Sequence, residues 1–504
     1  MRFCPSTSAA GIFQNVCKLT CCAALFNSPL SPHLILPSSP TYNTAITAHY
    51  TTNAPLEPAC ILQPQSSSHI AEAVSLLVEA DDGSTGCTFA IRGGGHNPSK
   101  GAASVQGGVT IDLAMMNETV YHPDKQTVEI MAGAKWGDVY KTLKPLGVAV
   151  TGGRSDSVGV GGLIIGGGMS YFAPQYGLAC DNVLSFEIVL SNGTIATASH
   201  TNNQRLFKAL KGGGNNFGIV TKVELRAFPQ GPLWGGLIGH EVSAIPAQIN
   251  ALVNFTSNMV TDTHAMLVTI WQHKHVGKTD TDVSFAASGL QYTLGQEVTK
   301  ARIFDEFLSL PAAFSSLRET DMDDLMMETA PPTGKRAVFL SLTFWNEERV
   351  LRYLHGLHEE AVKSVQEHGV ESEDWDVITF LQPFPAMFGD KGKDPEGANG
   401  NVLGLDRLSE DHLVLLIFLD WDNAADDTVF HNFGYDMIDK LKKYTREVGA
   451  DSDYIYMNYA ARDQNVLKGY GEDNLAFLRR VAKEYDPTGV FQAQVPGGFK
   501  VSAA

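Results

Sequence analysis

Three glycine clusters between residues 93 and 218 constrain the fold of this chain more than any other feature. They are Gly93-Gly94-Gly95 followed by His96, the segment 158–168 with six glycines, and Gly212-Gly213-Gly214 with Gly218. Glycine lacks a Cβ, so its backbone N–H groups can approach a ligand closely and form concave anion sites. Tight turns also use glycine. Three clusters that each lie beside an apolar strand nevertheless favour a nucleotide cofactor.

The common nucleotide-binding motifs do not fit these clusters. Gly159 and Gly161 are followed by Ile164 where the G-x-G-x-x-G fingerprint requires its third glycine. The chain also contains no G-x-x-x-x-G-K-[ST] motif and no G-x-S-x-G elbow, which argues against an ATPase and a serine hydrolase. The sequence therefore predicts a dinucleotide that is bound by a different glycine pattern.

Composition excludes some classes of partner. The 504 residues carry 37 basic and 55 acidic side chains, a net charge of −18, which repels the phosphates of nucleic acids. No apolar run reaches the roughly 18–20 residues that span a membrane. A chain of this length, 44% of it hydrophobic, is expected to form two or three domains.

The N-terminus differs from the rest in composition. Residues 1–50 are rich in Ser, Pro, Thr and Ala, which predicts a leader and an extended arm. The apolar stretch Leu19–Phe26 follows Gln14, Asn15 and Lys18, which break the clean apolar core of a signal peptide. The sequence thus leaves a secreted and a cytoplasmic location both open.

Four of the seven cysteines, Cys4, Cys17, Cys21 and Cys22, lie in the first 22 residues, and Cys60, Cys87 and Cys180 are scattered. An odd count without a C-x-x-C pair argues against a zinc site or a full disulfide framework. Two alternatives remain: a bridge from Cys21 or Cys22 to Cys60, and idle thiols.

Hydrophobic periodicity predicts a boundary near Phe228-Pro229. Before it, we expect strands at 61–64, 88–91, 109–113, 127–131 and 186–190 and helices at 66–80 and 136–143. After it, strands at 266–271, 338–343 and 413–421 alternate with helices at 347–367 and 427–448. The run Gly389–Asn401 is expected to be a loop, and the last helix spans 474–484. The pattern predicts an α+β fold whose second part is a sheet covered on one face by helices.

Two histidine patterns resemble metal sites only superficially. His273-Lys274-His275 has no third ligand at a suitable spacing, and His358-Glu359 has Val362 where H-E-x-x-H requires histidine. Both are expected to be solvated surface, and no metal site is predicted.

The glycine clusters belong to a longer set of motifs. These are Arg92–His96, Val158–Gly168, Tyr176-Gly177 with Cys180-Asp181-Asn182, Gly212–Thr221, Tyr456-Met457-Asn458-Tyr459 and Tyr485-Asp486-Pro487. With them the chain resembles, from Cys60 to Lys500, the berberine-bridge-enzyme-like oxidases of fungal type. That family belongs to the flavoprotein superfamily typified by vanillyl-alcohol oxidase and p-cresol methylhydroxylase.

The resemblance implies a division into domains. It gives a leader and arm at 1–50 and a two-subdomain FAD-binding domain of the p-cresol methylhydroxylase type at 54–229. A substrate-binding domain with an antiparallel sheet covered by helices follows at 230–450. A C-terminal segment at 451–504 returns to the FAD domain.

The resemblance also implies that FAD is bound covalently through the histidine of the R-G-G-H segment, which here is His96. Many relatives add a second bond from a cysteine at the position of Ser155, so this chain is expected to make one bond. At the neighbouring gate position, small residues in the family admit dioxygen, and Val158 is small. The residues implied in FAD binding are Arg92, Gly93, Gly94, Gly95, His96, Asn97, Ser155, Val158, Gly159, Gly161, Gly162, Gly167, Gly168, Asn182, Gly218, Ile219 and Val220.

For catalysis, the family's Y-x-N-Y segment implies Tyr459 as the base, with Tyr456 as the second candidate and Asn458 orienting a substrate or flavin oxygen. A free tyrosine has a pKa of about 10, so a base of this kind needs a supporting environment or concerted hydride departure. The other interpretation makes either tyrosine a wall residue.

The expected activity is that of an FAD-linked oxidase. It transfers hydride from a small organic molecule, a secondary-metabolite intermediate or a sugar, to FAD and then to dioxygen, giving H2O2. The alternative is a flavin-containing cyclase or isomerase without net oxidation. The protein is expected to be a monomer. The segments 382–385 and 401–405 resemble family segments on the sheet that faces the flavin. Four aromatic residues either line that pocket or belong to the core: Trp271, Trp345, Phe380 and Trp421.

Overall fold

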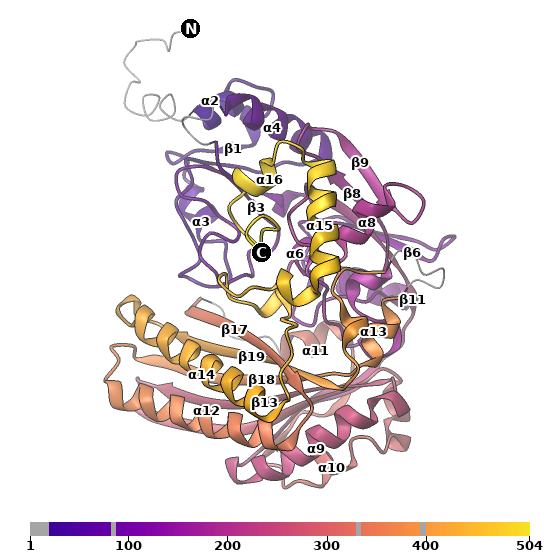
Figure 1. Cartoon of the computed structure of the whole chain (residues 1–504), viewed down its shortest axis with the longest axis vertical. Coiled ribbons are helices and arrows are strands. Elements are labelled where there is room, and N and C mark those ends of the chain that lie inside the picture. Colours follow the sequence, from indigo (N-terminus) through magenta and orange to yellow (C-terminus); the bar gives the residue numbers. More distant parts are fainter. Residues whose placement is uncertain (1–19, 82–86, 329–333, 394–399) are drawn as a thin grey trace.

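The computed structural model describes residues 20–81, 87–328, 334–393 and 400–504. In Figure 1 a glycine-rich region (residues 20–229) forms the upper half, and one large sheet with its helices forms the lower half. The expected α+β class is confirmed, since the large sheet is entirely antiparallel and its helices lie in separate segments. Among the helices that the structure describes, none combines the length and the apolar character needed to cross a membrane.

The glycine-rich region contains two main sheets. The first has the strand order β1-β2-β4-β3, and its strands β2, β3 and β4 run parallel. The second is antiparallel with the order β5-β6-β10-β8-β9. The strands are β1 (Leu34–Ile35), β2 (Cys60–Leu62), β3 (Phe89–Arg92), β4 (Val109–Asp112), β5 (Thr119–His122), β6 (Thr127–Met131), β8 (Val183–Val189), β9 (Ile195–Ser199) and β10 (Ile219–Arg226). Short strands β7 (Val148–Ala149) and β11 (Phe228–Pro229) pair with each other.

Helices of this region pack on the second sheet and on one another. In α4, the buried residues Ile70, Ala73, Val74 and Leu77 recur at helical spacing, and the Ser66 side chain caps the first turn by accepting from the His69 N–H. The helices are α2 (Thr20–Phe26), α3 (Tyr42–Ile46), α4 (Ser67–Ala80), α5 (Trp136–Leu143), α6 (Val160–Ile165), α7 (Ala173–Tyr176) and α8 (Gln204–Leu210).

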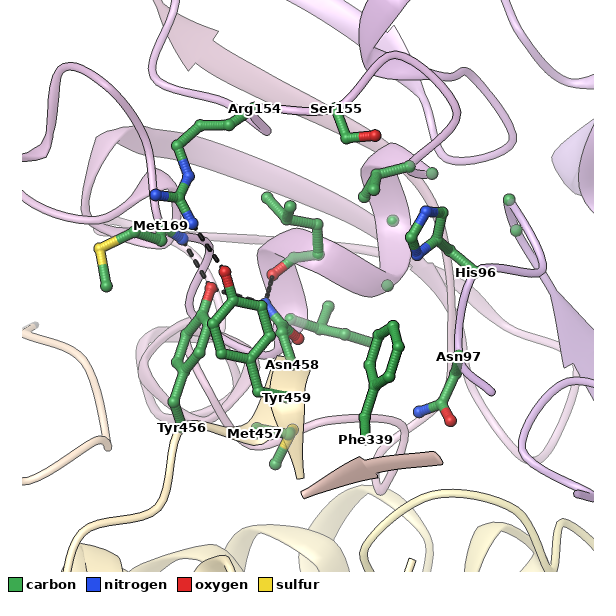
Figure 2. Close-up of a pocket in the computed structure, with 18 of the residues that line it drawn as sticks. His96, Asn97, Arg154, Ser155, Met169, Phe339, Tyr456, Met457, Asn458 and Tyr459 are labelled. Carbon is green, nitrogen blue, oxygen red and sulfur yellow. Dashed lines mark hydrogen bonds between the residues drawn. The ribbon is translucent and has the colours of Figure 1, made fainter. Parts of the chain in front are cut away.

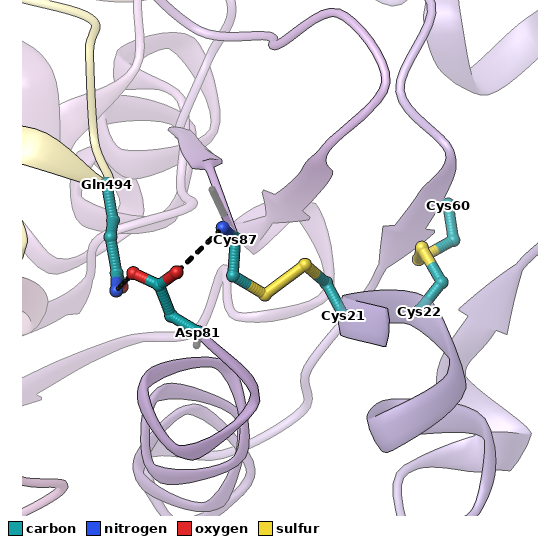
Figure 3. Close-up of a disulfide and its surroundings, with 6 residues drawn as sticks. All are labelled: Cys21, Cys22, Cys60, Asp81, Cys87 and Gln494. Carbon is teal, nitrogen blue, oxygen red and sulfur yellow. Dashed lines mark hydrogen bonds between the residues drawn. A yellow bond between two sulfur atoms is a disulfide. The ribbon is translucent and has the colours of Figure 1, made fainter. Parts of the chain in front are cut away.

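The N-terminal arm corrects the prediction of an extended segment. Residues 1–19 lie outside the described residues. From Thr20 the chain forms α2, which packs against α4 and is held by two disulfides, Cys21–Cys87 and Cys22–Cys60 (Figure 3). Among the described residues two bridges form, where the sequence suggested one at most. Cys180 is free and buried.

The disulfides should contribute strongly to stability. Cys22–Cys60 closes 38 positions of chain and Cys21–Cys87 closes 66. Removing one bridge with the double variant Cys22→Ser/Cys60→Ser should lower the free energy of unfolding by roughly 2–4 kcal/mol, because the unfolded chain regains entropy. The unfolding temperatures of the variant and the wild type, compared under non-oxidising and under oxidising conditions, measure this loss. A variant that unfolds at the wild-type temperature would contradict a structural role for the bridge.

The large sheet has the order β15-β12-β14-β13-β18-β19-β17, with β16 also paired to β12. Its strands are β12 (Leu233–His240), β13 (Ala265–Val276), β14 (Thr281–Tyr292), β15 (Phe314–Ser315), β16 (Arg318–Thr320), β17 (Arg336–Trp345), β18 (Asp374–Phe384) and β19 (His412–Trp421). The helices of this part are α9 (Ile245–Asn258), α10 (Asp305–Ser309), α11 (Met322–Glu328), α12 (Glu348–His368), α13 (Met387–Lys391) and α14 (Asp427–Val448).

Helices α9, α12 and α14 cover one face of the large sheet, as expected, and the other face turns toward the glycine-rich region (Figure 1). Side chains alternate between the two faces along each strand. In β13, for example, the buried Trp271 donates to Gln248 of α9, whereas Val268 and Ile270 face the other way. The sheet therefore presents one complete face for a site.

Each of the two histidine patterns expected at the surface contains one histidine, His273 or His358, that is buried instead. His273 lies on the helix side of β13, where its Nδ1 pairs with Ser284 (2.7 Å) and its ring stacks on Trp375. His358 is buried in α12 against Thr379 (3.0 Å), and burial lowers its pKa to about 3. The prediction was wrong because the residues next to these histidines in the sequence are polar. Those neighbours gave no sign that the histidines lie on a face packed against other elements.

The C-terminal segment returns to the glycine-rich region. Helices α15 (Glu472–Tyr485) and α16 (Val490–Ala493) lie in the upper half, with α15 beside α8 (Figure 1). Tyr470 donates to the Gly212 carbonyl (3.0 Å), and Asp486 accepts from the N–H groups of Val490 and Phe491. The expected loop 389–401 begins inside α13, and its residues 394–399 lie outside the described part of the chain.

Candidate cofactor site and active site

A cavity of about 360 Å³ lies where the glycine-rich loops, the large sheet and the C-terminal segment meet (Figure 2). Most residues expected to bind a cofactor or take part in catalysis line it. These are Gly93, Gly94, Gly95, His96, Asn97, Ser155, Val158, Gly159, Gly161, Gly162, Gly218, Ile219, Val220, Tyr456, Asn458 and Tyr459.

Four expected residues do not line the cavity. Arg92 is buried and forms an ion pair with Asp112 (2.9 Å), which anchors the glycine loop that follows β3. Asn182 donates to two backbone carbonyls at 2.9 and 3.0 Å. Gly167 and Gly168 have φ values of +111° and +86° and shape the turn after α6. None of the four is among the residues that line the cavity.

The first two glycine clusters form a cradle because their backbones touch. A Cβ on Gly94 would lie 2.5 Å from the Gly159 nitrogen, and a Cβ on Gly159 would lie 2.3 Å from the Gly94 nitrogen. Any side chain at either position would push the loops apart. Near Gly162, in contrast, nothing lies within 4 Å of the Cβ position, so this part of α6 borders open space.

His96 lies in the cavity wall with its ring stacked on Tyr50 (ring centroids 4.0 Å apart). Its Nε2 is buried and has no hydrogen-bond partner among the residues that the structure describes. Burial lowers the pKa of His96 to about 4, so the imidazole is neutral at pH 7. A neutral ring with an uncommitted nitrogen is the form that can attack an electrophilic carbon.

Ser155 and Val158 belong to one turn above His96 (Figure 2 shows Ser155 and His96). The Val158 N–H donates to the Ser155 carbonyl (3.4 Å), and the Val158 carbonyl accepts from Trp136 (3.0 Å). The buried Ser155 hydroxyl also lacks a partner among the described residues. Two orphaned polar atoms, one on each side of a glycine cradle, therefore face the same cavity.

Tyr459 is held by two hydrogen-bond donors. Arg154 Nη2 donates to its hydroxyl oxygen (2.7 Å) and to Gln382 Oε1 (2.6 Å), and Gln382 Nε2 donates to the same hydroxyl (2.6 Å). Since arginine cannot accept, Oε1 of Gln382 must face Arg154 and Nε2 must face Tyr459. The Tyr459 oxygen thus accepts two hydrogen bonds, one of them from a cation.

Arg154 and the role of Gln382 were not predicted from the sequence. Gln382 was noted only as part of a family-like segment, and Arg154 only stands next to Ser155. Their contacts join residues 228 and 305 positions apart. The signal available in the sequence was the positive charge of Arg154, directly before Ser155 in the turn expected to contact the flavin.

Tyr456 and Asn458 are committed to the protein. The buried Tyr456 hydroxyl accepts from the Met169 N–H (2.7 Å) and from Asn458 Nδ2 (3.1 Å). Burial raises the Tyr456 pKa, which opposes its ionisation. Asn458 Nδ2 also donates to the Leu163 carbonyl (3.0 Å), so this side chain joins the C-terminal segment to α6.

The sheet side of the cavity is apolar. Phe339, Phe380 and Phe418 line it from three neighbouring strands. Of the four aromatic residues considered above, only Phe380 is among the lining residues. Trp271 and Trp421 are buried in the core, and Trp345 packs against its edge.

The cavity fits a flat, nucleotide-linked cofactor. The backbone cradle accepts phosphates and a ring edge without side-chain clash, and the orphaned His96 Nε2 supplies a site for a covalent bond. No group of three or more His, Cys, Asp or Glu side chains that could hold a metal occurs among the described residues. The donor set therefore fits a flavin dinucleotide.

Known proteins share the sequence and the fold. Residues 58–199 match the family described as the FAD binding domain. The chain is 39% identical over 483 residues to the FAD-dependent monooxygenase drtC of Aspergillus calidoustus, covering 96% of this chain and 90% of that protein. It is 37% identical over 485 residues to the FAD-dependent monooxygenase sdcF of Emericella nidulans, covering 96% and 98%.

Two solved structures show the same fold. Xylooligosaccharide oxidase from Myceliophthora thermophila C1 has a TM-score of 0.74 at 22% identity, covering 95% of this chain and 99% of that one. The 6-hydroxy-D-nicotine oxidase of Arthrobacter nicotinovorans has a TM-score of 0.74 at 21% identity, covering 91% and 96%.

Proposed function

Since the chain belongs to the fungal-type berberine-bridge-enzyme-like family of FAD-linked oxidoreductases, we propose that it is an oxidase with FAD bonded once, through His96. The substrate is a small organic molecule that gives up a hydride and a proton. When bound, FAD supplies the two-electron acceptor, and dioxygen takes up two electrons and two protons to give H2O2. The protein's part is to hold the cofactor and substrate and to accept the proton.

The Tyr459 oxygen carries this proposal. It lies on the cavity wall, where Arg154 and Gln382 hold it with two hydrogen bonds. In its deprotonated form this oxygen accepts the proton from a substrate hydroxyl or activated C–H while the hydride leaves. Tyr456 serves this role less well, because its oxygen is buried and already bound by Met169 and Asn458.

The names of the relatives support a second candidate, monooxygenation. In that reaction one oxygen atom of dioxygen enters the substrate and the other leaves as water, with two electrons from an added reductant such as a reduced nicotinamide. The two candidates share the cofactor site and differ in the fate of oxygen.

One experiment tests both. Anaerobic stopped-flow mixing with a metabolite library identifies compounds that bleach the flavin, and the reaction is then run in ¹⁸O₂. An oxidase gives labelled peroxide and unlabelled product, whereas a monooxygenase gives labelled product and needs the reductant. Product formed without peroxide, label or bleaching would instead favour a redox-neutral cyclase or isomerase.

We also propose a location for the protein, which the sequence left open. Disulfides persist in oxidising compartments and are rare in the cytosol. The two bridges at Cys21–Cys87 and Cys22–Cys60 thus support a secreted rather than a cytoplasmic protein.

Val158 provides a test of oxygen access. We expect Val158→Leu to slow reoxidation of the reduced flavin by dioxygen about tenfold or more. The reason is that the added methylene narrows the path of dioxygen past the turn beside the glycine cradle. Reduction by substrate should change much less. Stopped-flow traces of the two half-reactions measure this, with Val158→Ala as the control of opposite size. Equal slowing of both half-reactions would contradict the gate.

A further inference from the structure

The sheet face that borders the cavity is almost free of charge. Leu237, Val268, Ile270 and Leu416 line it together with the three phenylalanines named above. Among the described lining residues, the only side chain with a formal charge is Arg154, which donates to Gln382 and Tyr459. A wall of this kind favours a neutral substrate with a flat, apolar part.

One polar side chain on this face has no partner. Gln291 of β14 is fully buried and borders the cavity. Neither its Oε1 nor its Nε2 has a hydrogen bond to any residue that the structure describes. A buried amide without partners is costly and rare, so it points to a ligand that completes it.

Gly289 lets the Gln291 amide lie over the sheet. It stands two residues earlier on β14, on the same face, and both line the cavity. A Cβ at Gly289 would lie 3.1 Å from Gln291 Nε2 and 3.4 Å from a Leu237 methyl group. A larger residue would displace the amide, so the glycine keeps this polar group at the cavity.

Two other buried glutamines show that the missing partners are specific to Gln291. Gln382 is bound by Arg154 and Tyr459. Gln248 donates to the Ala287 carbonyl (2.9 Å) and to the Ser288 hydroxyl (3.0 Å), and it accepts from Trp271 (3.0 Å). The amides of Gln382 and Gln248 are thus satisfied within the protein, whereas the Gln291 amide is left for a ligand.

The register places Gln291 at a distance from Tyr459. Across the sheet, Leu381 lies opposite Thr269 and Gly289 lies opposite Val268, so β13 separates β18 from β14. Gln382 and Gln291 therefore rise from strands that are separated by one strand, roughly 10 Å apart. A rigid molecule of two rings can contact both ends.

We propose that Gln291 determines substrate specificity by binding a neutral hydroxyl or amide on an otherwise apolar, aromatic substrate. Its Nε2 donates to the ligand oxygen and its Oε1 accepts the ligand's O–H or N–H. The reacting carbon then lies at the other end, by Tyr459. This inference rests on the proposed function, and it favours an aromatic metabolite over a sugar.

The first test needs no substrate. Gln291→Met keeps the volume and removes the unsatisfied amide, so the unliganded holoenzyme should melt about 1–3 °C higher than the wild type. Gln291→Leu serves as a second variant. The matched control Gln248→Met removes a satisfied amide and should melt several degrees lower. A fall for Gln291→Met as large as that for Gln248→Met would overturn the proposal.

The second test uses three probes at pH 7: 2-naphthol, 2-methoxynaphthalene and 2-naphthoate, titrated against the holoenzyme by their effect on flavin absorbance. The wild type should bind 2-naphthol about tenfold more tightly than the methyl ether, the effect of one lost hydrogen bond, and naphthoate least. Gln291→Met should lose this preference. An unchanged preference in the variant, tightest binding of naphthoate, or no binding of 2-naphthol would overturn the proposal.

These outcomes separate the inference from the proposed function. If the purified protein contains no flavin, or if Tyr459→Phe keeps full activity, the proposed function fails while the melting comparison still decides the role of Gln291. If flavin and activity are as expected and the Gln291 variant behaves like Gln248→Met, only the specificity inference fails.

Discussion

His96→Ala protein should lose all of its acid-stable yellow colour. The wild type should keep FAD attached after precipitation in acid, because the bond runs through the protein. The His96 Nε2 is buried, lies in the cavity wall and has no partner among the described residues. Burial lowers the His96 pKa to about 4, which leaves its lone pair available at neutral pH. Absorbance of the washed pellet and in-gel flavin fluorescence measure the result.

The stacked ring of Tyr50 supplies a matched control. Tyr50→Phe keeps the aromatic face that packs on His96 at 4.0 Å between centroids and removes only the hydroxyl. This variant should stay yellow in acid. Tyr50→Ala removes the packing and should lower the attached fraction, since the imidazole is then free to rotate. A yellow acid pellet from His96→Ala would show that attachment occurs elsewhere.

Ser155 sharpens the same experiment. Its buried hydroxyl is another group on the cavity wall without a partner among the described residues, but a serine hydroxyl is a much weaker nucleophile than a neutral imidazole or a thiolate. Ser155→Ala should therefore keep the covalent flavin. The double variant His96→Ala/Ser155→Ala should match His96→Ala alone.

Local patterns predicted those parts of the fold that short-range physics determines. The helix 427–448 and the strand 127–131 were predicted to the residue, because their apolar positions recur at helical and strand periods. The glycine clusters indicated a nucleotide-type loop for the same reason, since backbone freedom is visible in a single residue type. The family resemblance then added the histidine and the cofactor.

Contacts between distant segments could not be predicted from the sequence. The segment 1–50 was predicted as a leader and an extended arm because it is rich in Ser, Pro, Thr and Ala, yet Cys21 and Cys22 bind Cys87 and Cys60 and draw α2 onto α4. No local pattern encodes which cysteines meet. In the same way, Gln291 looks like any strand residue until the register shows that its side chain borders the cavity without a partner.

The candidate base shows both what the sequence can predict and what it cannot. Tyr459 was predicted from its motif, but its environment was not. Arg154 and Gln382 come from other parts of the chain, and only the folded structure brings a guanidinium and an amide onto one phenol oxygen.

Tyr459→Phe should slow anaerobic reduction of the flavin by substrate about 10²–10⁴-fold, the usual contribution of a positioned acid or base. The ring and its T-shaped contact with Tyr456 (4.9 Å between centroids) remain, so covalent flavin content should equal that of the wild type. A reduction rate within threefold of the wild type would make Tyr459 a wall residue.

The control for this variant is Tyr456→Phe. It removes a hydroxyl that accepts from Met169 and Asn458, so it should lower the free energy of unfolding by about 1–3 kcal/mol and change the reduction rate little. If Tyr456→Phe instead caused the larger loss of rate, the two tyrosines would exchange roles.

Variants of Arg154 test whether Tyr459 acts alone or together with Arg154. Arg154→Lys keeps the positive charge but cannot reproduce a guanidinium that donates to both Gln382 and Tyr459, so flavin reduction should slow about tenfold or more. If Arg154 acts through its hydrogen bond to the Tyr459 oxygen, the same change made in Tyr459→Phe should have no further effect on the rate. Residues that work through one another are non-additive in this way. Independent, multiplying losses in the double variant would show that Arg154 contacts the substrate or cofactor directly, and the stabilisation of Tyr459 would then have to come from Gln382 alone.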